Sequence, residues 1–141
     1  MTPDESQRAS ESTSHQRASR YEQGMAVRRR VLGEKYVDRS IEAADDFSLP
    51  MQELTTEFCW GAIWTRPGLD LRTRSILNLG MLTALNRSHE LAAHIRGALN
   101  NGVTRDEIRE VLLQTAVYVG VPAALESFRT AQRVLAEIEQ E

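Results

Sequence analysis

The chain has 141 residues, of which 41% are hydrophobic and 26% charged, a size and composition that fit one globular domain. Its formal net charge of -3 and its 17 dispersed basic residues argue against a nucleic-acid-binding surface. A single cysteine, Cys59, excludes an internal disulfide. Because no segment resembles a signal peptide or a membrane span, we expect a cytoplasmic protein with no membrane partner.

The first twenty residues differ in composition from the rest. Residues 1–20 are rich in Ser, Gln, Glu and Arg, and no large aliphatic side chain follows Met1. Burial therefore cannot offset the entropy lost on ordering this segment. We expect a disordered N-terminal tail over residues 1–20 and a folded domain over residues 21–141.

Apolar side chains recur at helical spacing from residue 21 onward. The pattern predicts a first helix over 21–33, which Gly33 ends, and a short helix or an irregular crossing over 37–47. Pro50 then opens a helix that runs to about Trp60, and a Trp-rich stretch leads from there into a Pro-Gly turn. Cys59 lies in this apolar region, where we expect a small buried thiol rather than a nucleophile.

Four further helices are predicted in the second half of the chain. Asp70 is a candidate N-cap for a helix over 71–85 that is apolar around most of its circumference, which predicts a central helix buried on several sides. A helix over 88–100 follows, and Thr104 with Glu107 then forms a capping box for the next helix. Pro122 starts the last helix, and no segment has the period of a strand. We therefore predict an all-α fold of about six helices.

Glu90 and His94 are the one Glu/His pair that a single helical turn would place side by side on an otherwise apolar face. A carboxylate beside a poorly hydrated imidazole fixes its orientation and favours its protonated form, which suits a proton donor near neutral pH. The alternative is a hydrogen-bonded core histidine without a chemical role.

Two arginines, Arg72 and Arg74, occupy the first turn of the helix over 71–85. Cations there oppose the helix dipole, so a functional reason is expected. For Arg72, an ion pair with a nearby Asp or Glu on the surface is an equal alternative.

Several familiar chemistries fail their spacing requirements. His89 and His94 are five residues apart, whereas a zinc-protease helix needs two histidines four apart, so we expect no metal. The chain also lacks a Gly-rich phosphate loop, paired cysteines and a serine elbow. The enzymatic option that is left is proton chemistry without a cofactor.

The chain closely resembles the carboxymuconolactone decarboxylase family over residues 20 to 137. The resemblance lies in the order and spacing of six segments: Arg-Tyr-Glu-Gln-Gly (20–24), residues 60–69, Thr-Arg-Ser (73–75), Glu90 to His94, residues 98–104, and Gly-Val-Pro-Ala-Ala (120–124).

This resemblance implies the all-helical fold of the alkyl hydroperoxidase D-like proteins and a homo-oligomer, commonly a hexamer built as a trimer of dimers. Peroxidase relatives carry Cys-x-x-Cys-x-x-x-His on the corresponding helix. Aligning His94 with their histidine places Arg87 and Glu90 at the two cysteines. We therefore expect peroxidase activity to be absent.

The activity that the resemblance implies is the cofactor-free decarboxylation of 4-carboxymuconolactone to 3-oxoadipate enol-lactone in protocatechuate degradation. The substrate is a small lactone dicarboxylate whose own conjugated carbonyl accepts the electrons. We expect His94 to donate the proton and stabilise the dienolate, and Glu90 to orient His94.

The remaining candidate residues would bind the substrate. We expect Arg74, with Arg72 or Arg66, to bind a carboxylate in bidentate fashion. Trp60 and Trp64 would exclude water, although packing is the better interpretation for at least one of them.

Three alternatives remain open at this point. A member of the same family could act on another small lactone or a β-keto acid by the same proton chemistry. A non-catalytic oligomeric protein of the same fold would use Glu90 and His94 as a structural pair. A thiol peroxidase would depend on Cys59 alone, which lacks a resolving partner.

Overall fold

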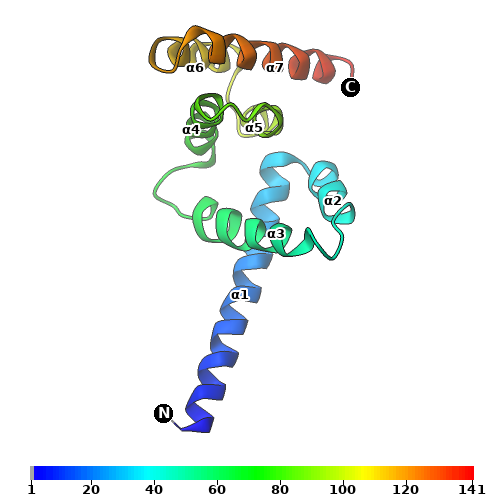
Figure 1. The fold of residues 1–141 in the computed structure, drawn as a ribbon, viewed down its shortest axis with the longest axis vertical. Coiled ribbons are helices and arrows are strands. Elements are labelled where there is room, and N and C mark those ends of the chain that lie inside the picture. Colours follow the sequence, from blue (N-terminus) through cyan, green and yellow to red (C-terminus); the bar gives the residue numbers. More distant parts are fainter. Residues whose placement is uncertain (1) are drawn as a thin grey trace. The chain divides into compact units, whose positions relative to one another are not determined.

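The computed structural model describes residues 2–141, and all regular elements within that range are helical (Figure 1). The all-α prediction is therefore confirmed. In chain order the elements are α1 (Pro3–Leu32), α2 (Glu34–Glu42), α3 (Leu49–Leu54), the π-helix η1 (Thr55–Trp64), α4 (Leu71–Ala84), α5 (Ser88–Asn100), α6 (Arg105–Tyr118) and α7 (Val121–Glu139).

The structure has more helical elements than the predicted six, and the difference arises in the first half of the chain. The segment over 37–47, which had two possible interpretations, overlaps α2, and the helix predicted from Pro50 divides into α3 and η1. The elements form two compact units, of which the first ends at Pro67 and the second begins at Gly68. No helix within residues 2–141 is long and apolar enough to cross a membrane.

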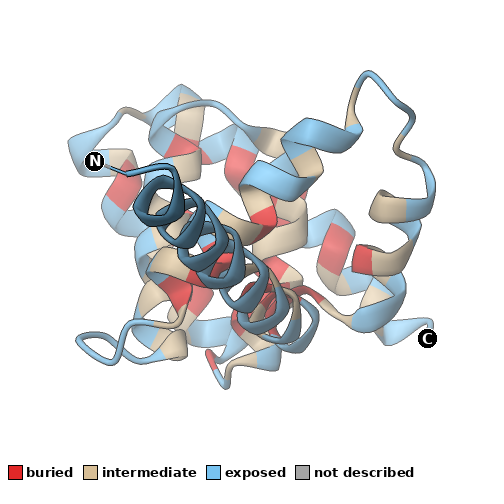
Figure 2. Ribbon diagram, turned by 90° about the horizontal axis from the view of Figure 1, so that it is seen from below, coloured by how far each residue is buried: buried red, intermediate tan, exposed pale blue. Residues whose placement is uncertain are grey.

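Helix α1 begins at Pro3 and includes the segment for which we expected a disordered tail. A capping box supports this start: the Thr2 side chain accepts a hydrogen bond from the Glu5 backbone N–H, and the Glu5 carboxylate accepts one from the Thr2 N–H. The expectation of disorder rested on amino-acid composition, which does not take a local capping interaction into account. Residues 2–20 are nevertheless exposed along their whole length (Figure 2).

Within the first unit, α1 packs closely on η1 because two glycines face the contact. A Cβ on Gly24 would lie 2.2 Å from the Thr56 carbonyl oxygen and 2.6 Å from the Gly61 nitrogen. A Cβ on Gly61 would lie 2.3 Å from the Arg20 carbonyl oxygen. These distances are far below van der Waals contact, so this approach of the two backbones requires glycine at both positions.

Arg28 joins the helices of the first unit from within. It is only 5% exposed, and its two terminal nitrogens donate to Thr56 Oγ1 and Gln52 Oε1, each at 2.9 Å. Burial lowers the pKa of the guanidinium from its ordinary value. A buried cation held by neutral acceptors makes the packing of α1 on α3 and η1 specific.

The second unit is built around α4, which contacts α5, α6 and α7. Its central position is as predicted, but one of its faces is not covered, since Leu77, Met81 and Leu85 are about half exposed within residues 2–141. The core of the unit is formed by buried side chains from all four helices and the loop before α6: Leu79, Leu91, Ile95, Ala98, Val103, Ile108, Leu112, Ala131 and Val134.

Both predicted N-caps in this unit are confirmed. The Asp70 side chain accepts from the Thr73 N–H at 2.7 Å and begins α4. At α6 the Thr104 hydroxyl accepts from the Glu107 N–H, and Glu107 Oε1 accepts from the Thr104 N–H, both at 3.1 Å.

Candidate active site

Helices α4 and α5 form an antiparallel pair whose register is fixed at one end by Asn101. The Asn101 amide, just after α5, donates to Ser75 Oγ at 2.9 Å and to the Leu71 carbonyl at 3.3 Å. The end of α5 therefore lies beside the start of α4. This register brings the middle of α4 opposite the middle of α5, where the candidate histidine lies.

Asn78 on α4 contacts His94 on α5. The Asn78 amide nitrogen lies 3.4 Å from His94 Nδ1. Sequence reasoning did not identify Asn78. Its one distinguishing feature was that it is a polar residue within a mostly apolar helix, four positions after Arg74.

The protonation of His94 differs from our expectation. Burial lowers the pKa of His94 to about 4, and the nearby carboxylate of Glu90, which raises the pKa, compensates only in part. Glu90 itself is exposed, so water weakens its effect. The imidazole is therefore neutral near pH 7, and the prediction that its protonated form is favoured was wrong.

Charged residues flank the His94–Asn78 contact. Residues four apart on a helix share a face, so Arg74 lies one turn from Asn78 and Glu90 one turn from His94. Because α4 and α5 run in opposite directions, Arg74 and Glu90 lie on opposite sides of the contact, each about 6 Å away along the helix axis. The arrangement is a cation, a neutral imidazole with its amide partner, and an anion in a row.

Arg72 has a partner of its own. It forms an ion pair with Glu107 of α6, and both side chains are partly exposed. This is the surface pair that we gave as the alternative for Arg72. Each residue of an α-helix turns the chain by about 100°, so side chains two positions apart differ in direction by about 200°. Arg72 and Arg74 therefore lie on different faces of α4.

Comparison with known proteins places these residues in a family. The model of the carboxymuconolactone decarboxylase family matches residues 50–133, which is more than half of the chain. The chain belongs to this family. The match includes every candidate site residue proposed from the sequence.

Individual relatives are similar to this chain over most of their own length. A 4-carboxymuconolactone decarboxylase of Acinetobacter baylyi is 44% identical over 119 residues, which cover 84% of this chain and 89% of that protein. A nitrosuccinic acid decarboxylase of Metarhizium robertsii is 45% identical over 115 residues, 82% of this chain and 80% of that protein. A 4-carboxymuconolactone decarboxylase of Pseudomonas putida is 48% identical over 42 residues, 30% of this chain and 88% of that sequence.

The tryptophans of this carboxymuconolactone decarboxylase family member belong to its first unit. Trp60 and Trp64 stack on each other, with ring centroids 4.7 Å apart and planes inclined by 29°. They are 4% and 7% exposed, so both are packed side chains, as we expected for at least one. Arg66 follows η1 in the same unit and is exposed. The unit of Trp60, Trp64 and Arg66 ends at Pro67, whereas Arg74, Glu90 and His94 belong to the unit that follows.

Cys59 does not have the environment that we predicted for it. Its side chain is exposed on η1, so the interpretation as a small buried thiol was wrong. The chain contains no second cysteine with which it could form a disulfide within one molecule.

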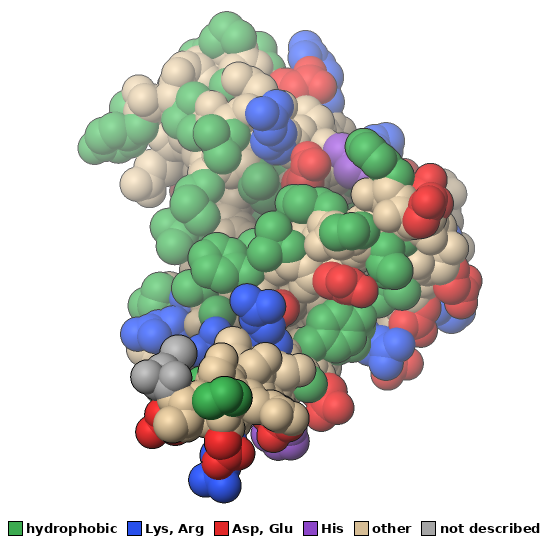
Figure 3. All heavy atoms as spheres, turned by 60° about the horizontal axis from the view of Figure 1, so that its bottom comes forward, with side chains coloured by type: hydrophobic (Ala, Val, Ile, Leu, Met, Phe, Trp, Pro, Cys, Tyr) green, Lys and Arg blue, Asp and Glu red, His purple; other side chains and the backbone are tan. Residues whose placement is uncertain are grey.

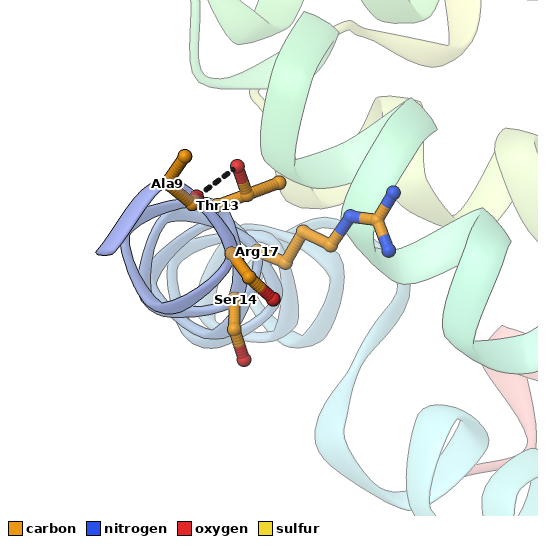
Figure 4. Close-up of a pocket in the computed structure, with 5 residues that line it drawn as sticks. Ala9, Thr13, Ser14 and Arg17 are labelled. Atoms are coloured by element: carbon orange, nitrogen blue, oxygen red, sulfur yellow. Dashed lines mark hydrogen bonds between the residues drawn. The ribbon is translucent and has the colours of Figure 1, made fainter. Parts of the chain in front are cut away.

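A shallow hollow of about 400 Å³ lies against the exposed part of α1 (Figure 4). Its lining consists of Ala9, Ser10, Thr13, Ser14 and Arg17. Thr13 donates its hydroxyl hydrogen to the Ala9 carbonyl, and Arg17 reaches toward Glu57 of η1 at 4.0 Å. Apart from Arg17, the lining consists of an alanine and small hydroxyl side chains, so we assign this hollow no chemical role.

Proposed function

We propose that this protein catalyses the cofactor-free decarboxylation of 4-carboxymuconolactone to 3-oxoadipate enol-lactone, a step of protocatechuate degradation. The observation that carries the proposal is the 44% identity to the Acinetobacter decarboxylase over 84% of this chain and 89% of that protein. Identity of this level over nearly the whole of both chains favours a shared reaction rather than a shared fold alone.

The reaction makes definite demands on the site. The bond from the ring carbon to the departing carboxylate breaks, and its electron pair passes through the ring C=C bond to the lactone carbonyl oxygen. A proton is then added to the carbon next to that carbonyl, which gives the enol-lactone. The protein must therefore bind two carboxylates, stabilise the growing negative charge on oxygen and supply one proton.

His94 is suited to the oxygen on which charge develops. A neutral imidazole can polarise a carbonyl by donating a hydrogen bond, which does not require the imidazolium form. Binding of a dicarboxylate nearby would raise the pKa of His94 from about 4, because negative charge favours the imidazolium. The same residue would then hold the proton that the dienolate carbon receives.

The flanking charges would orient the substrate. Arg74 would bind a carboxylate, and Glu90, on the opposite side of His94, would repel one. A dicarboxylate would therefore be held with a carboxylate toward Arg74 and its lactone carbonyl near the imidazole. Arg72, which is paired with Glu107, is the weaker candidate for this contact.

A second candidate substrate follows from the Metarhizium relative, a nitrosuccinic acid decarboxylase that is 45% identical to this chain. Nitrosuccinate is also a dicarboxylate, and its nitro group can accept the electron pair that the departing carboxylate leaves behind. The sequence identities to the two relatives, 44% and 45%, are too similar to decide between their substrates. A nitro-dicarboxylate is therefore the alternative substrate class, with the same demand for carboxylate binding and proton delivery.

One experiment tests both candidates. Purified protein is incubated with each substrate in the presence of a chelator, and loss of the substrate is followed by absorbance. We expect turnover of the lactone, a large loss of kcat in His94→Gln, and wild-type rates in the matched control His89→Gln, at an exposed position of the same helix. Turnover of nitrosuccinate alone would favour the alternative, and turnover of neither would contradict the proposal.

We further propose that the protein is a homo-oligomer, with a hexamer as the expected state. Large apolar side chains reach the surface on both units (Figure 3). Where exposed apolar side chains form a continuous patch, the patch commonly marks a contact with another protein chain. In the first unit Phe47 precedes α3, and the others lie on α3 and η1: Leu49, Met51, Leu54, Phe58 and Ile63. In the second most of them lie on α4 and its C-cap Leu85, on α6 and on α7: Leu77, Met81, Leu85, Leu113, Val117, Tyr118, Val121 and Leu125.

Light scattering measures the molar mass directly and tests this proposal. Six chains per particle are expected, and a 15.9 kDa monomer across the micromolar range would contradict it. Met81→Glu, on the uncovered face of α4, should lower the mass if that face is an interface.

A further inference from the structure

The amide of Asn78 meets the imidazole of His94 at one particular atom. It lies on the neighbouring helix, with its Nδ2 directed at His94 Nδ1 at 3.4 Å. The Asn101 hydrogen bonds to Ser75 and Leu71 fix the register that makes this contact possible. The contact is thus built into the α4–α5 pair and does not depend on a flexible loop.

We propose that Asn78 is a positioning residue that sets the tautomer of His94, holding the proton on Nε2 by donating a hydrogen bond to Nδ1. A neutral imidazole has one nitrogen that donates and one that accepts, and an amide NH₂ group can only donate. Where that group faces Nδ1, Nδ1 must be the acceptor. The proton then resides on Nε2.

The surroundings of His94 favour the neutral ring that this argument requires. Burial lowers the pKa of His94 to about 4, and Glu90 on the same helix opposes this in part. On α4, Arg74 lies one turn from Asn78. On α7, which packs against α5, Glu137 pairs with Arg96, and so does Glu141 just after the end of α7.

An amide at position 78 differs in kind from a carboxylate. A carboxylate there would accept from Nδ1–H, move the proton to Nδ1 and raise the pKa of the ring. The consequence of the Asn78–His94 hydrogen bond for catalysis rests on the proposed function. In that function, Nε2–H of His94 donates a hydrogen bond to the lactone carbonyl as negative charge develops on its oxygen. Asn78 acts there only through His94.

Nitrogen NMR of the full-length protein tests the tautomer without any need for activity. The protein is labelled at its three histidines, His15, His89 and His94, and the His94 signals are identified by their absence from His94→Gln. At neutral pH we expect a neutral ring with the hydrogen on Nε2. A hydrogen on Nδ1, or a fully protonated ring, would overturn the proposal even if the enzyme is active.

Two variants extend the test. Asn78→Asp should move the hydrogen to Nδ1, raise the pKa of His94 and lower kcat by about tenfold or more, with a smaller effect on KM. Asn78→Leu, which removes the donor without adding charge, should give a mixture of tautomers. The charge-matched control is Gln114→Glu, at an exposed position of α6, which should leave the His94 signals and the pH profile unchanged.

These readouts separate the two hypotheses. Inactive wild-type protein with the hydrogen on Nε2 would contradict the proposed function but not the role of Asn78. Unchanged His94 signals in both folded Asn78 variants would overturn that role, whatever the activity.

Discussion

Arg72 of α4 and Glu107 of α6 are joined through a carboxylate that has two functions. Glu107 Oε1 accepts the Thr104 backbone N–H that completes the capping box of α6, while Oε2 forms the ion pair with Arg72. The start of α4 is thereby connected to the start of α6. Arg72 is thereby joined to α6, and Arg74, two positions later, lies on the face of α4 that carries Asn78.

The two arginines should consequently respond differently to the same substitution. Arg74→Gln is expected to lower kcat/KM by about 10- to 100-fold, the loss expected when a charged hydrogen bond to a carboxylate is removed. Arg72→Gln should leave kcat/KM close to wild type and lower the free energy of unfolding by no more than about 1 kcal/mol, because the pair is partly exposed.

Steady-state kinetics and urea unfolding of both variants test this assignment. Each arginine is the matched control for the other, since they differ by two positions in one helical turn. A larger kinetic loss in Arg72→Gln than in Arg74→Gln would show that the roles are reversed.

The low pKa of His94 makes the stability of the protein depend on pH. The unfolded chain binds a proton at His94 below about pH 6.5, whereas the folded protein does so only near pH 4. The stabilising effect of the neutral ring is thus complete above pH 6.5 and is lost as the pH falls toward 4. The shift corresponds to at most about 3 kcal/mol.

Urea unfolding at pH 7 and at pH 4.5 measures this effect. Wild-type protein should lose more stability between these values than His94→Gln, in which the titrating group is absent. His89→Gln, at an exposed position of the same helix, should follow the wild type. Parallel losses in wild type and His94→Gln would refute the buried neutral imidazole.

The features that the sequence predicted correctly are mostly local ones. Both N-caps, the end of α1 at Gly33 and the order of the helices depend on residues a few positions apart, whose spacing is visible in the chain. The family resemblance was also read from short segments in a fixed order, and the family match confirms it.

What the sequence did not predict depends on packing between helices. Asn78 contacts His94 only because Asn101 sets the register of α4 and α5. The register between two helices cannot be deduced from the spacing of residues within each of them. The sign of the His94 pKa shift was missed for a similar reason. Spacing placed Glu90 beside His94, but burial, which outweighs Glu90, comes from the surrounding fold.

The N-terminal part of α1 is expected to contribute little to stability. Residues 2–16 are exposed, and the backbone contact of α1 with Gly61 begins at Arg20. Deletion of residues 2–16 should therefore change the free energy of unfolding by less than about 0.5 kcal/mol and leave kcat unchanged. Circular dichroism of the two forms would show how much helix this segment contributes. A marked loss in the free energy of unfolding would contradict the expectation that the rest of the protein is stable without this segment.

Two glycines in helices should give opposite results when changed to alanine. Gly24→Ala places a methyl group 2.2 Å from the Thr56 carbonyl oxygen and 2.6 Å from the Gly61 nitrogen, both backbone atoms that cannot move aside. A loss of more than about 3 kcal/mol in the free energy of unfolding is expected. Gly80→Ala, on α4, meets no atom within 4 Å and should stabilise the protein by about 0.5–1 kcal/mol through its helix propensity.

Urea unfolding of both variants, with light scattering to hold the oligomeric state constant, separates local crowding from helix propensity. If Gly24→Ala is as stable as wild type, α1 and η1 do not approach as closely as the structure has them. If Gly80→Ala is destabilised while its molar mass falls, the uncovered face of α4 is occupied by another subunit, because a methyl group that meets nothing within one chain would then meet a neighbour.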